Sequence, residues 1–338
     1  MMTIIEAYEA EMPRGFSLFH RETYFYPNIE AYLKRQYAAS KKSLKGQSLA
    51  GKVEYGCMGF VQDPYRVGVY TAFKNNDMEL LNNVVYLSAC MCHMDMVSSY
   101  DHGAFAYELL PLLFSARLFD RVKLAVPEAV GMSRNGYTKT SSTIVNLIMA
   151  LLYQRDDFAV YARKCADECL NRKLTISERS MLCFLLALCD QNRSEASAQL
   201  AEICRGISKS KEPYDTPFDR MLSLSAMGMY NFAVYAEPDF AKTIELPKNK
   251  NFCRSFISWQ LQNRDYAGKP FIHYEAPLDF YNAVLTTLPP AITLYEDHDK
   301  PFRCWSVDEK KFRDELIQKI LEQYENGSGT GEGRKDGF

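Results

Sequence analysis

Four short polar breaks recur along the first two-thirds of the chain, each between two apolar runs with helical spacing. The breaks contain Asp77, Asp120, Asp157 and Arg193, and successive breaks are 43, 37 and 36 residues apart. Apolar residues that repeat every three or four positions form one face of an amphipathic helix. Each run, break and second run therefore predicts two antiparallel helices packed as a hairpin.

A repeat of this length is typical of stacked helical hairpins, as in tetratricopeptide and HEAT arrays. No stretch alternates between apolar and polar residues over several segments, and the alternating βα pattern of a nucleotide-binding fold is missing. A sheet is therefore not expected. The sequence predicts an all-α protein, in which stacked antiparallel helical hairpins form an irregular tetratricopeptide/HEAT-like array of about 12–15 helices.

The chain divides into four parts by composition. Residues 1–27 are predicted to be an irregular lead-in, and residues 28–208 the helical-hairpin array. The polar segment 209–214 is the best candidate boundary between two halves, so that residues 214–325 form a C-terminal helical half packed on the array. The Gly-rich segment 326–338 is predicted to be a disordered tail, either native or left over from cloning.

Local signals place several helix starts. Asp63-Pro64 supplies a cap residue followed by proline at the first helical position, and Thr175-Ile176-Ser177-Glu178 reads as a capping box. In the C-terminal half the pattern loosens, and helices are expected at about 217–235, 251–262 and 277–295. A final helix is expected to follow Ser306-Val307-Asp308-Glu309.

Charge and length exclude several classes of partner. The 338 residues carry 40 Lys+Arg against 42 Asp+Glu, a net charge of −2, which argues against a broad nucleic-acid-binding surface. The N-terminus carries acids where a secretory signal carries bases, and the uncharged runs are shorter than the roughly 20 residues that span a bilayer. We therefore expect a cytoplasmic protein with no nucleic-acid or membrane partner.

The most metal-like cluster is Cys90-Met91-Cys92-His93. A structural zinc site needs further ligands at a suitable spacing, and this cluster ends an apolar helical run. Free cysteine often packs as a small buried hydrophobe, and most of the ten cysteines lie in apolar helical runs. Buried packing of reduced cysteines is favoured here, with a metal site as the alternative.

The pair Asp101-His102 is the nearest approach to a catalytic group. A carboxylate can orient an imidazole for acid–base chemistry, but an aspartate at a helix start is more often an N-cap. The sequence has no metalloprotease histidine pair, nucleophile elbow, phosphate loop or dinucleotide fingerprint. We therefore predict a protein that is not an enzyme and has no catalytic residues, metal, cofactor or small-molecule substrate.

An acidic segment near the C-terminus is the candidate partner-binding site. It comprises Tyr295, Glu296, Asp297 and Asp299, and it is expected to be a loop between two helices. Acidic side chains can speed the approach of a basic partner, and a tyrosine beside them can anchor the contact. An ordinary solvated loop is the alternative interpretation, and the helices of residues 60–210 are then the next candidate interface.

The order of these features resembles the all-α immunity proteins of bacterial polymorphic-toxin systems, most nearly the forty-ninth immunity family. The resemblance covers about residues 60–210 and is carried by two breaks, Phe73-Lys74-Asn75-Asn76-Asp77 and Leu151-Leu152-Tyr153-Gln154-Arg155-Asp156-Asp157. It implies a cytoplasmic protein that neutralises a cognate toxin domain, such as one delivered by type VI secretion, by binding it and occluding its active site. The alternative is a tetratricopeptide-like adaptor or regulator that binds a peptide or protein in its concave groove.

Overall fold

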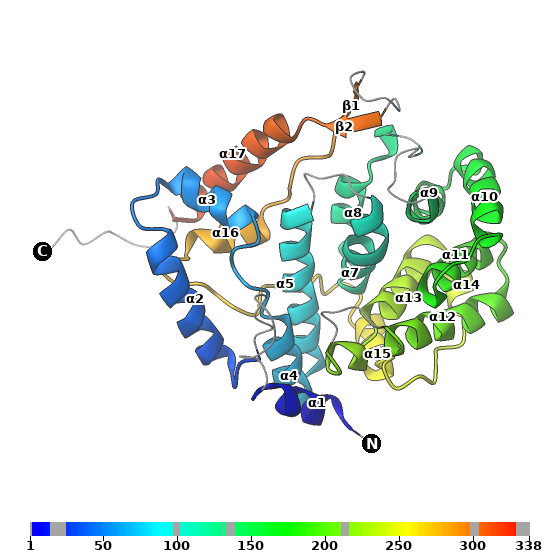
Figure 1. Ribbon diagram of the computed structural model, residues 1–338, viewed down its shortest axis with the longest axis horizontal. Coiled ribbons are helices and arrows are strands. Elements are labelled where there is room, and N and C mark those ends of the chain that lie inside the picture. Colours follow the sequence, from blue (N-terminus) through cyan, green and yellow to red (C-terminus); the bar gives the residue numbers. More distant parts are fainter. Residues whose placement is uncertain are drawn as a thin grey trace, which may run out of the picture.

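The structure is a computed structural model that describes residues 2–13, 25–96, 102–130, 132, 139–210, 216–297 and 304–328. The regular elements of this part of the chain are helices apart from one short two-stranded ribbon, which confirms the predicted all-α class (Figure 1). Asp101, Asp299, most of the 209–214 boundary and the tail beyond residue 328 lie outside the described residues. Among the described helices, none combines the length and apolar character needed to cross a membrane.

The elements of the first part of the chain are α1 (Ile4–Glu11), α2 (Ile29–Ser43), α3 (Leu49–Cys57), α4 (Tyr65–Asn75), α5 (Met78–Met96), α6 (His102–Ala104), the π-helix η1 (Phe105–Leu109), α7 (Leu110–Ser115), α8 (Phe119–Ala125) and the 3-10 turn η2 (Glu128–Val130). Two long hairpins follow, made of α9 (Lys139–Tyr153), α10 (Asp156–Leu170), α11 (Ile176–Cys189) and α12 (Arg193–Ser208). The last part contains the 3-10 turn η3 (Asp219–Met221), α13 (Leu224–Ala236), α14 (Pro238–Ala241), α15 (Arg254–Gln262), α16 (Phe280–Thr286), β1 (Leu294–Asp297), β2 (Cys304–Val307) and α17 (Glu309–Ser328).

The four polar breaks predicted from the sequence are real helix ends with one shared backbone conformation. Each contains a non-glycine residue with positive φ, namely Asn76, Arg117, Gln154 and Gln191 at 50°, 57°, 51° and 49°. At each break the next amide donates to the carbonyl five residues earlier, for example Arg155 N to Ala150 O at 3.0 Å. This left-handed turn satisfies the last carbonyls of the helix and reverses the chain within a few residues.

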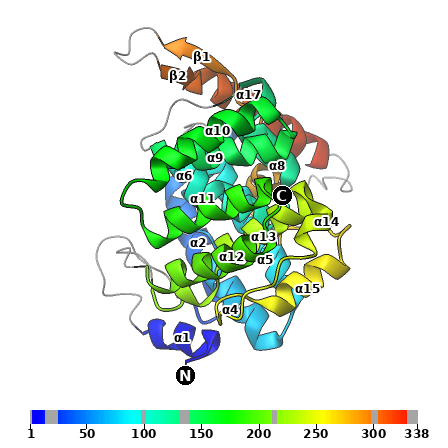
Figure 2. The same cartoon turned by 90° about the vertical axis from the view of Figure 1, so that its right-hand side faces the viewer.

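The stacked hairpins α9–α10 and α11–α12 lie on the right-hand side of the molecule in Figure 1, the side that faces the viewer in Figure 2, but the whole chain is not a linear array. Repeats in a solenoid contact only their sequence neighbours. Here α13 packs against α7, α15 against α5, and both α16 and α17 against α3. The C-terminal elements therefore return to cover the N-terminal helices.

The lead-in prediction is wrong for residues 4–11, which form α1. Thr3 caps this helix, because its hydroxyl accepts from the Glu6 amide at 3.2 Å and the Glu6 carboxylate accepts from the Thr3 amide at 2.7 Å. Tyr8 on the same helix is fully buried and stacks on Tyr70 of α4, with ring centroids 4.3 Å apart. The capping box predicted at Thr175 is confirmed. The sequence Thr3-Ile4-Ile5-Glu6 carries the same signal, a threonine followed three residues later by a glutamate.

The helix predicted over 277–295 is also wrong in its second half. α16 ends at Thr286, and Pro289 and Pro290 lie outside any helix, because proline cannot donate within a helix and disfavours the helical region before it. The chain then enters β1, which pairs antiparallel with β2 so that Leu294 lies opposite Val307. The acidic segment thus begins in a strand, not in a loop between two helices.

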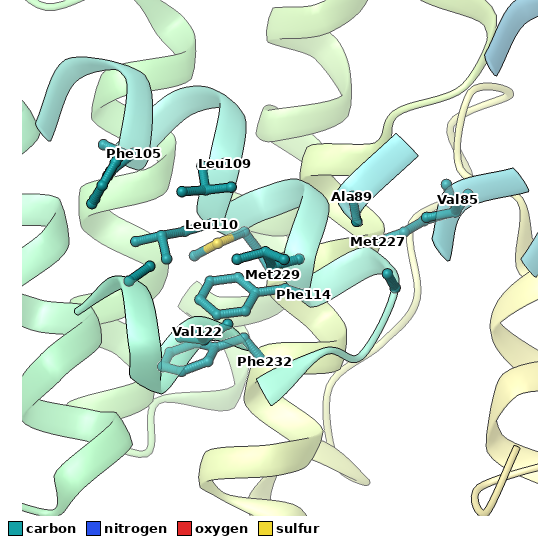
Figure 3. Close-up of a cluster of buried hydrophobic side chains, with 14 of the residues drawn as sticks. Val85, Ala89, Phe105, Leu109, Leu110, Phe114, Val122, Met227, Met229 and Phe232 are labelled. Carbon is teal, nitrogen blue, oxygen red and sulfur yellow. The ribbon is translucent and has the colours of Figure 1, made fainter. Parts of the chain in front are cut away.

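The core is centred where α7 meets α13, with contributions from α5, η1 and α8 (Figure 3). Phe114 stacks on Phe232 across this contact with ring centroids 4.6 Å apart. The labelled side chains of the cluster are all inaccessible to solvent: Val85, Ala89, Phe105, Leu109, Leu110, Phe114, Val122, Met227, Met229 and Phe232.

Gly228 permits the close approach of these two helices. A Cβ at Gly228 would lie 2.2 Å from the Pro111 carbonyl oxygen and 2.9 Å from the Ser115 hydroxyl. Pro111 lies in α7, so the clash would be with backbone and could not be relieved by a side-chain rotation. Glycine destabilises the middle of a helix relative to alanine, and this close contact explains why glycine nevertheless occurs at position 228.

A buried amide network fixes α15 against the same contact. The Gln260 side-chain amide donates to Asn82 Oδ1 and to the Ser115 carbonyl, both at 2.9 Å. Its oxygen accepts from Asn231 Nδ2 at 2.9 Å. Because these donors and acceptors are buried, losing one partner would leave the other unsatisfied in the core.

Replacing Gly228 with alanine should lower the free energy of unfolding by about 3 kcal/mol, because the new methyl group must separate α7 from α13. Urea unfolding followed by circular dichroism measures this loss. Gly51→Ala is the matched control, since the nearest atom to a Cβ there is 3.5 Å away. Equal stability of the two variants would contradict the proposed close approach.

Candidate functional site

A groove of about 550 Å³ opens where the ends of α9, α10, α11 and α13 meet. Its apolar lining includes Ala150 and Leu151 from the last turn of α9, Ala159 from α10 and Cys189 from the end of α11. Val160 of α10 stands at the groove with 71% of its surface exposed. The groove therefore combines a mainly buried apolar floor with an exposed aliphatic side chain.

The predicted breaks explain why the groove forms at this place. The left-handed residue Gln154 lines the groove and joins α9 directly to α10, which brings Ala150 and Ala159 to the same recess. Gln191 ends α11 in the same way, two residues after Cys189. Glu237, the C-cap residue of α13, completes the lining of the groove.

The two arginines at the groove are already engaged by acids. The Arg155 guanidinium donates to both oxygens of Asp157 at 2.8 and 2.7 Å and to Glu128 at 3.0 Å. Arg163 forms an ion pair with Asp190 at 2.5 Å. Each of these cations is therefore already paired with at least one carboxylate.

The two acids that line the groove, unlike the arginines, are not paired with an opposite charge within the described part of the chain. Among the residues that the structure describes, neither Asp156 nor Glu237 takes part in an ion pair. Asp156 belongs to the first turn of α10, where the helix dipole stabilises a negative charge. The groove therefore carries a surplus of negative charge.

An exposed aromatic side chain lies close in sequence to this groove. Tyr235, two residues before Glu237, is 40% exposed and stacks on Phe119 with ring centroids 3.9 Å apart. The Lys123 ammonium lies 5.7 Å from the centre of the Tyr235 ring. An exposed tyrosine held by stacking is a side chain that protein interfaces commonly use as an anchor.

The structure does not place the predicted partner-binding residues in this groove. Tyr295, Glu296 and Asp297 lie in β1, at the ribbon drawn beside the start of α17 in Figure 1, and Asp299 lies outside the described residues. Tyr295 is 49% exposed, so it remains accessible to a partner. Its role in binding stays a prediction.

The Cys90-Met91-Cys92-His93 cluster lies on α5, and Cys90 and His93 are fully buried there. Burial raises the pKa of Cys90 and raises that of Cys92 to about 12, whereas metals bind the thiolate. Burial, with the nearby Arg121 cation, holds the pKa of His93 well below its usual range. The described residues contain no group of three His, Cys, Asp or Glu side chains placed to hold a metal ion, and the nine cysteines whose side chains the structure describes are free thiols.

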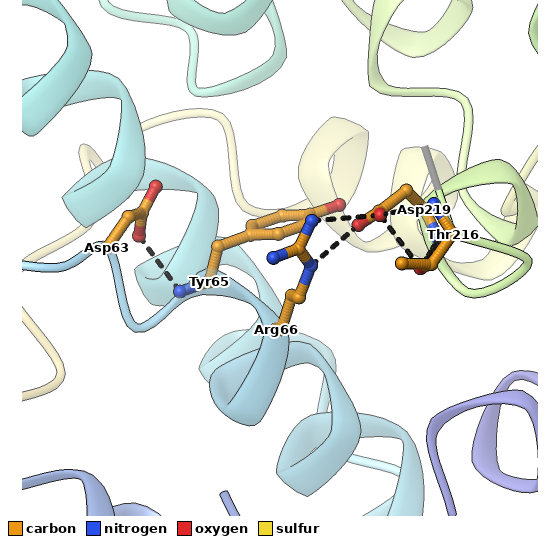
Figure 4. Close-up of polar contacts among 5 residues, drawn as sticks. All are labelled: Asp63, Tyr65, Arg66, Thr216 and Asp219. Carbon is orange, nitrogen blue, oxygen red and sulfur yellow. Dashed lines mark hydrogen bonds and ion pairs between the residues drawn. The ribbon is translucent and has the colours of Figure 1, made fainter. Parts of the chain in front are cut away.

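A second polar site, which sequence reasoning treated only as a helix cap, surrounds Asp63 (Figure 4). Asp63 Oδ1 accepts from the Tyr65 amide at 2.9 Å and from the Ser88 hydroxyl at 2.8 Å. The carboxyl group keeps contact with solvent, yet the protein packed around it desolvates the charge and raises its pKa to about 6. The cap prediction is shifted by one residue, because Pro64 is the N-cap of α4 and Asp63 precedes it as a carboxyl group whose pKa is raised to about 6.

The contacts next to Asp63 hold the start of α4 in place. Arg66, on the next turn, binds both oxygens of Asp219 at 2.9 Å, and Asp219 also accepts from the Thr216 amide and hydroxyl (Figure 4). This ion pair joins the start of α4 to η3 across 153 residues of sequence. Ser88 is only 1% exposed, so its hydroxyl is closed to a substrate and the pair with Asp63 is not a nucleophilic site.

Asp63→Asn should remove a pH-dependent cost of folding. Because the pKa of Asp63 is raised from 3.8 to about 6 in the folded state, the stability that it contributes is complete below about pH 4 and is lost as the pH rises through 6. Asparagine keeps the acceptor oxygen without the charge. The variant should therefore match the wild type at about pH 4 and exceed it by about 1 kcal/mol at about pH 7.5, after allowance for the solvent contact.

Urea unfolding at the two pH values measures this difference, with Asp265→Asn at an exposed loop position as the control. A constant offset between Asp63→Asn and the wild type at both pH values would show that Asp63 does not titrate as described.

No protein-family model matches the sequence, and comparisons with curated proteins and with solved structures gave no significant match. The resemblance to the immunity proteins therefore stays a prediction that rests on the two quoted breaks.

Proposed function

We propose that this chain is a protein-binding protein that neutralises a cognate toxin domain by direct contact and occlusion of its active site. The observation that carries the proposal is the groove at the ends of α9, α10, α11 and α13, with the exposed Val160 beside unbalanced acids. Segment 151–157, which carries much of the resemblance to immunity proteins, contributes four residues to this groove.

Several features support binding rather than catalysis as the role of the groove. Its arginines are neutralised by acids, and its thiol, Cys189, has a pKa raised chiefly by burial, so it is a poor nucleophile. Exposed apolar side chains next to charged groups are instead the usual composition of a protein interface. An adaptor of the tetratricopeptide type would use the concave inner face of its hairpins, whereas this groove lies at helix ends.

Growth protection tests the proposal directly. Candidate toxin domains taken from the gene neighbourhood are each expressed from an inducible promoter, with and without this chain, and growth is recorded. We expect the wild type to restore growth and Val160→Glu to lose at least about tenfold in affinity, because a charge at the centre of an interface is left desolvated. Leu288→Glu, at a position that is 51% exposed outside the groove, is the matched control and should protect like the wild type.

Charge reversal of Glu296, Asp297 and Asp299 distinguishes the ribbon from the groove. If the acidic segment steers a basic partner, the triple variant should associate more slowly and with a weaker salt dependence at unchanged thermal stability. Full protection by this variant, together with failure of Val160→Glu, assigns the interface to the groove. Full protection by both variants would refute the groove, and failure of the wild type to bind or protect would refute the proposed function.

A further inference from the structure

We infer that the groove receives a lysine or arginine side chain of the partner, held between Asp156 and Glu237 with its aliphatic stem on the apolar floor. This inference rests on the proposed function, since it names the chemistry of the group that the same groove binds. It commits to a basic residue in a segment of a protein partner.

The charges at the groove favour a cation over an anion. Both cations that line it, Arg155 and Arg163, are held by acids that lie outside the lining. A new anion would have to displace those acids, and it would also approach the negative charges of Asp156 and Glu237. A new cation meets two acids that have no ion pair among the described residues, so it gains attraction without breaking an existing contact.

The shape and lining of the groove suit a long side chain with a charged end. Ala150 and Leu151 are 4% and 8% exposed and form an apolar surface beside Ala159. Lysine and arginine place their methylene groups on such surfaces while the charged end reaches a polar rim. Val160, at 71% exposure, offers an apolar contact to the residues that flank the basic one.

Cys189 provides a native probe inside the groove. Cys189 lines the groove together with Asp156 and Glu237, so a fragment attached to its sulfur is delivered to the proposed cation site. Thiol–disulfide exchange with a small disulfide leaves a fragment on Cys189 and releases one fragment thiol. The yield at equilibrium then reports how well the groove accommodates the charge of that fragment.

The test compares three reagents on the purified full chain: cystamine, bis(2-hydroxyethyl) disulfide and 3,3′-dithiodipropionate, which deliver a cation, a neutral group and an anion. Adducts at Cys189 and at Cys253 are quantified by peptide mass spectrometry. Cys253 is partly exposed and outside the groove lining, so it corrects for the different redox chemistry of the reagents. We expect the cationic adduct at Cys189, relative to Cys253, to exceed the neutral one by about threefold, and the anionic adduct to be the weakest.

Substitutions identify the groups responsible. Asp156→Asn and Glu237→Gln should each reduce the preference for the cation, and about 0.5 M sodium chloride should weaken it. Glu309→Gln, at an exposed position on α17, is the matched control and should leave the preference unchanged. Equal yields of the three fragments, or a preference for the anion, would overturn the inference.

The outcomes separate this inference from the proposed function. Growth protection that depends on Val160 without a cation preference at Cys189 would retain the protein-binding groove and reject the basic occupant. A cation preference without any protein bound or growth restored would retain the cation site and reject the neutralising function.

Discussion

The contact between α7 and α13 is the interaction on which the rest of the architecture depends. Gly228 makes this contact possible, because it has no side chain to keep the Pro111 carbonyl away. The stacked rings of Phe114 and Phe232 add a buried aromatic contact between the same two helices. Because α7 and α13 are separated by more than 100 residues, this contact is among those that join the two halves of the chain. The buried side-chain amide of Gln260 holds α15 against this contact through hydrogen bonds to α5, α7 and α13.

The same contact explains the position of the candidate groove. Once α13 is fixed against α7, the end of α13 brings Glu237 to the groove that the turn between α9 and α10 also lines. The groove is therefore made partly by the hairpins and partly by the C-terminal half, and neither half alone contains all of it. The segment 151–157, which resembles immunity proteins, supplies one wall with Asp156, and Glu237, 80 positions after that segment, supplies the second negative charge.

Local signals in the sequence predicted the elements better than their assembly. The four breaks were located because each joins two helices through a short polar turn, and the structure shows a left-handed residue in every one. The helix at Ile4–Glu11 was missed although Thr3 and Glu6 signalled it, and the ribbon after Pro290 was missed because four-residue strands leave too short an alternation. The groove could not be predicted, since Cys189 and Glu237 approach Ala150 only through tertiary packing. Asp63 was recognised as a helix start, but its raised pKa depends on packing that no local pattern encodes.

Hydrogen–deuterium exchange of the complex with the neutralised toxin domain tests the central claim most directly, because it maps the bound surface without substitutions. If the groove is the binding site, amide exchange in the complex is slower at the α9–α10 turn, at the end of α11 and around Glu237. Exchange at the buried α7–α13 contact is expected to be unchanged. Protection confined to β1 and β2, with the α9–α10 turn unaffected, would contradict the assignment of the groove as the binding site.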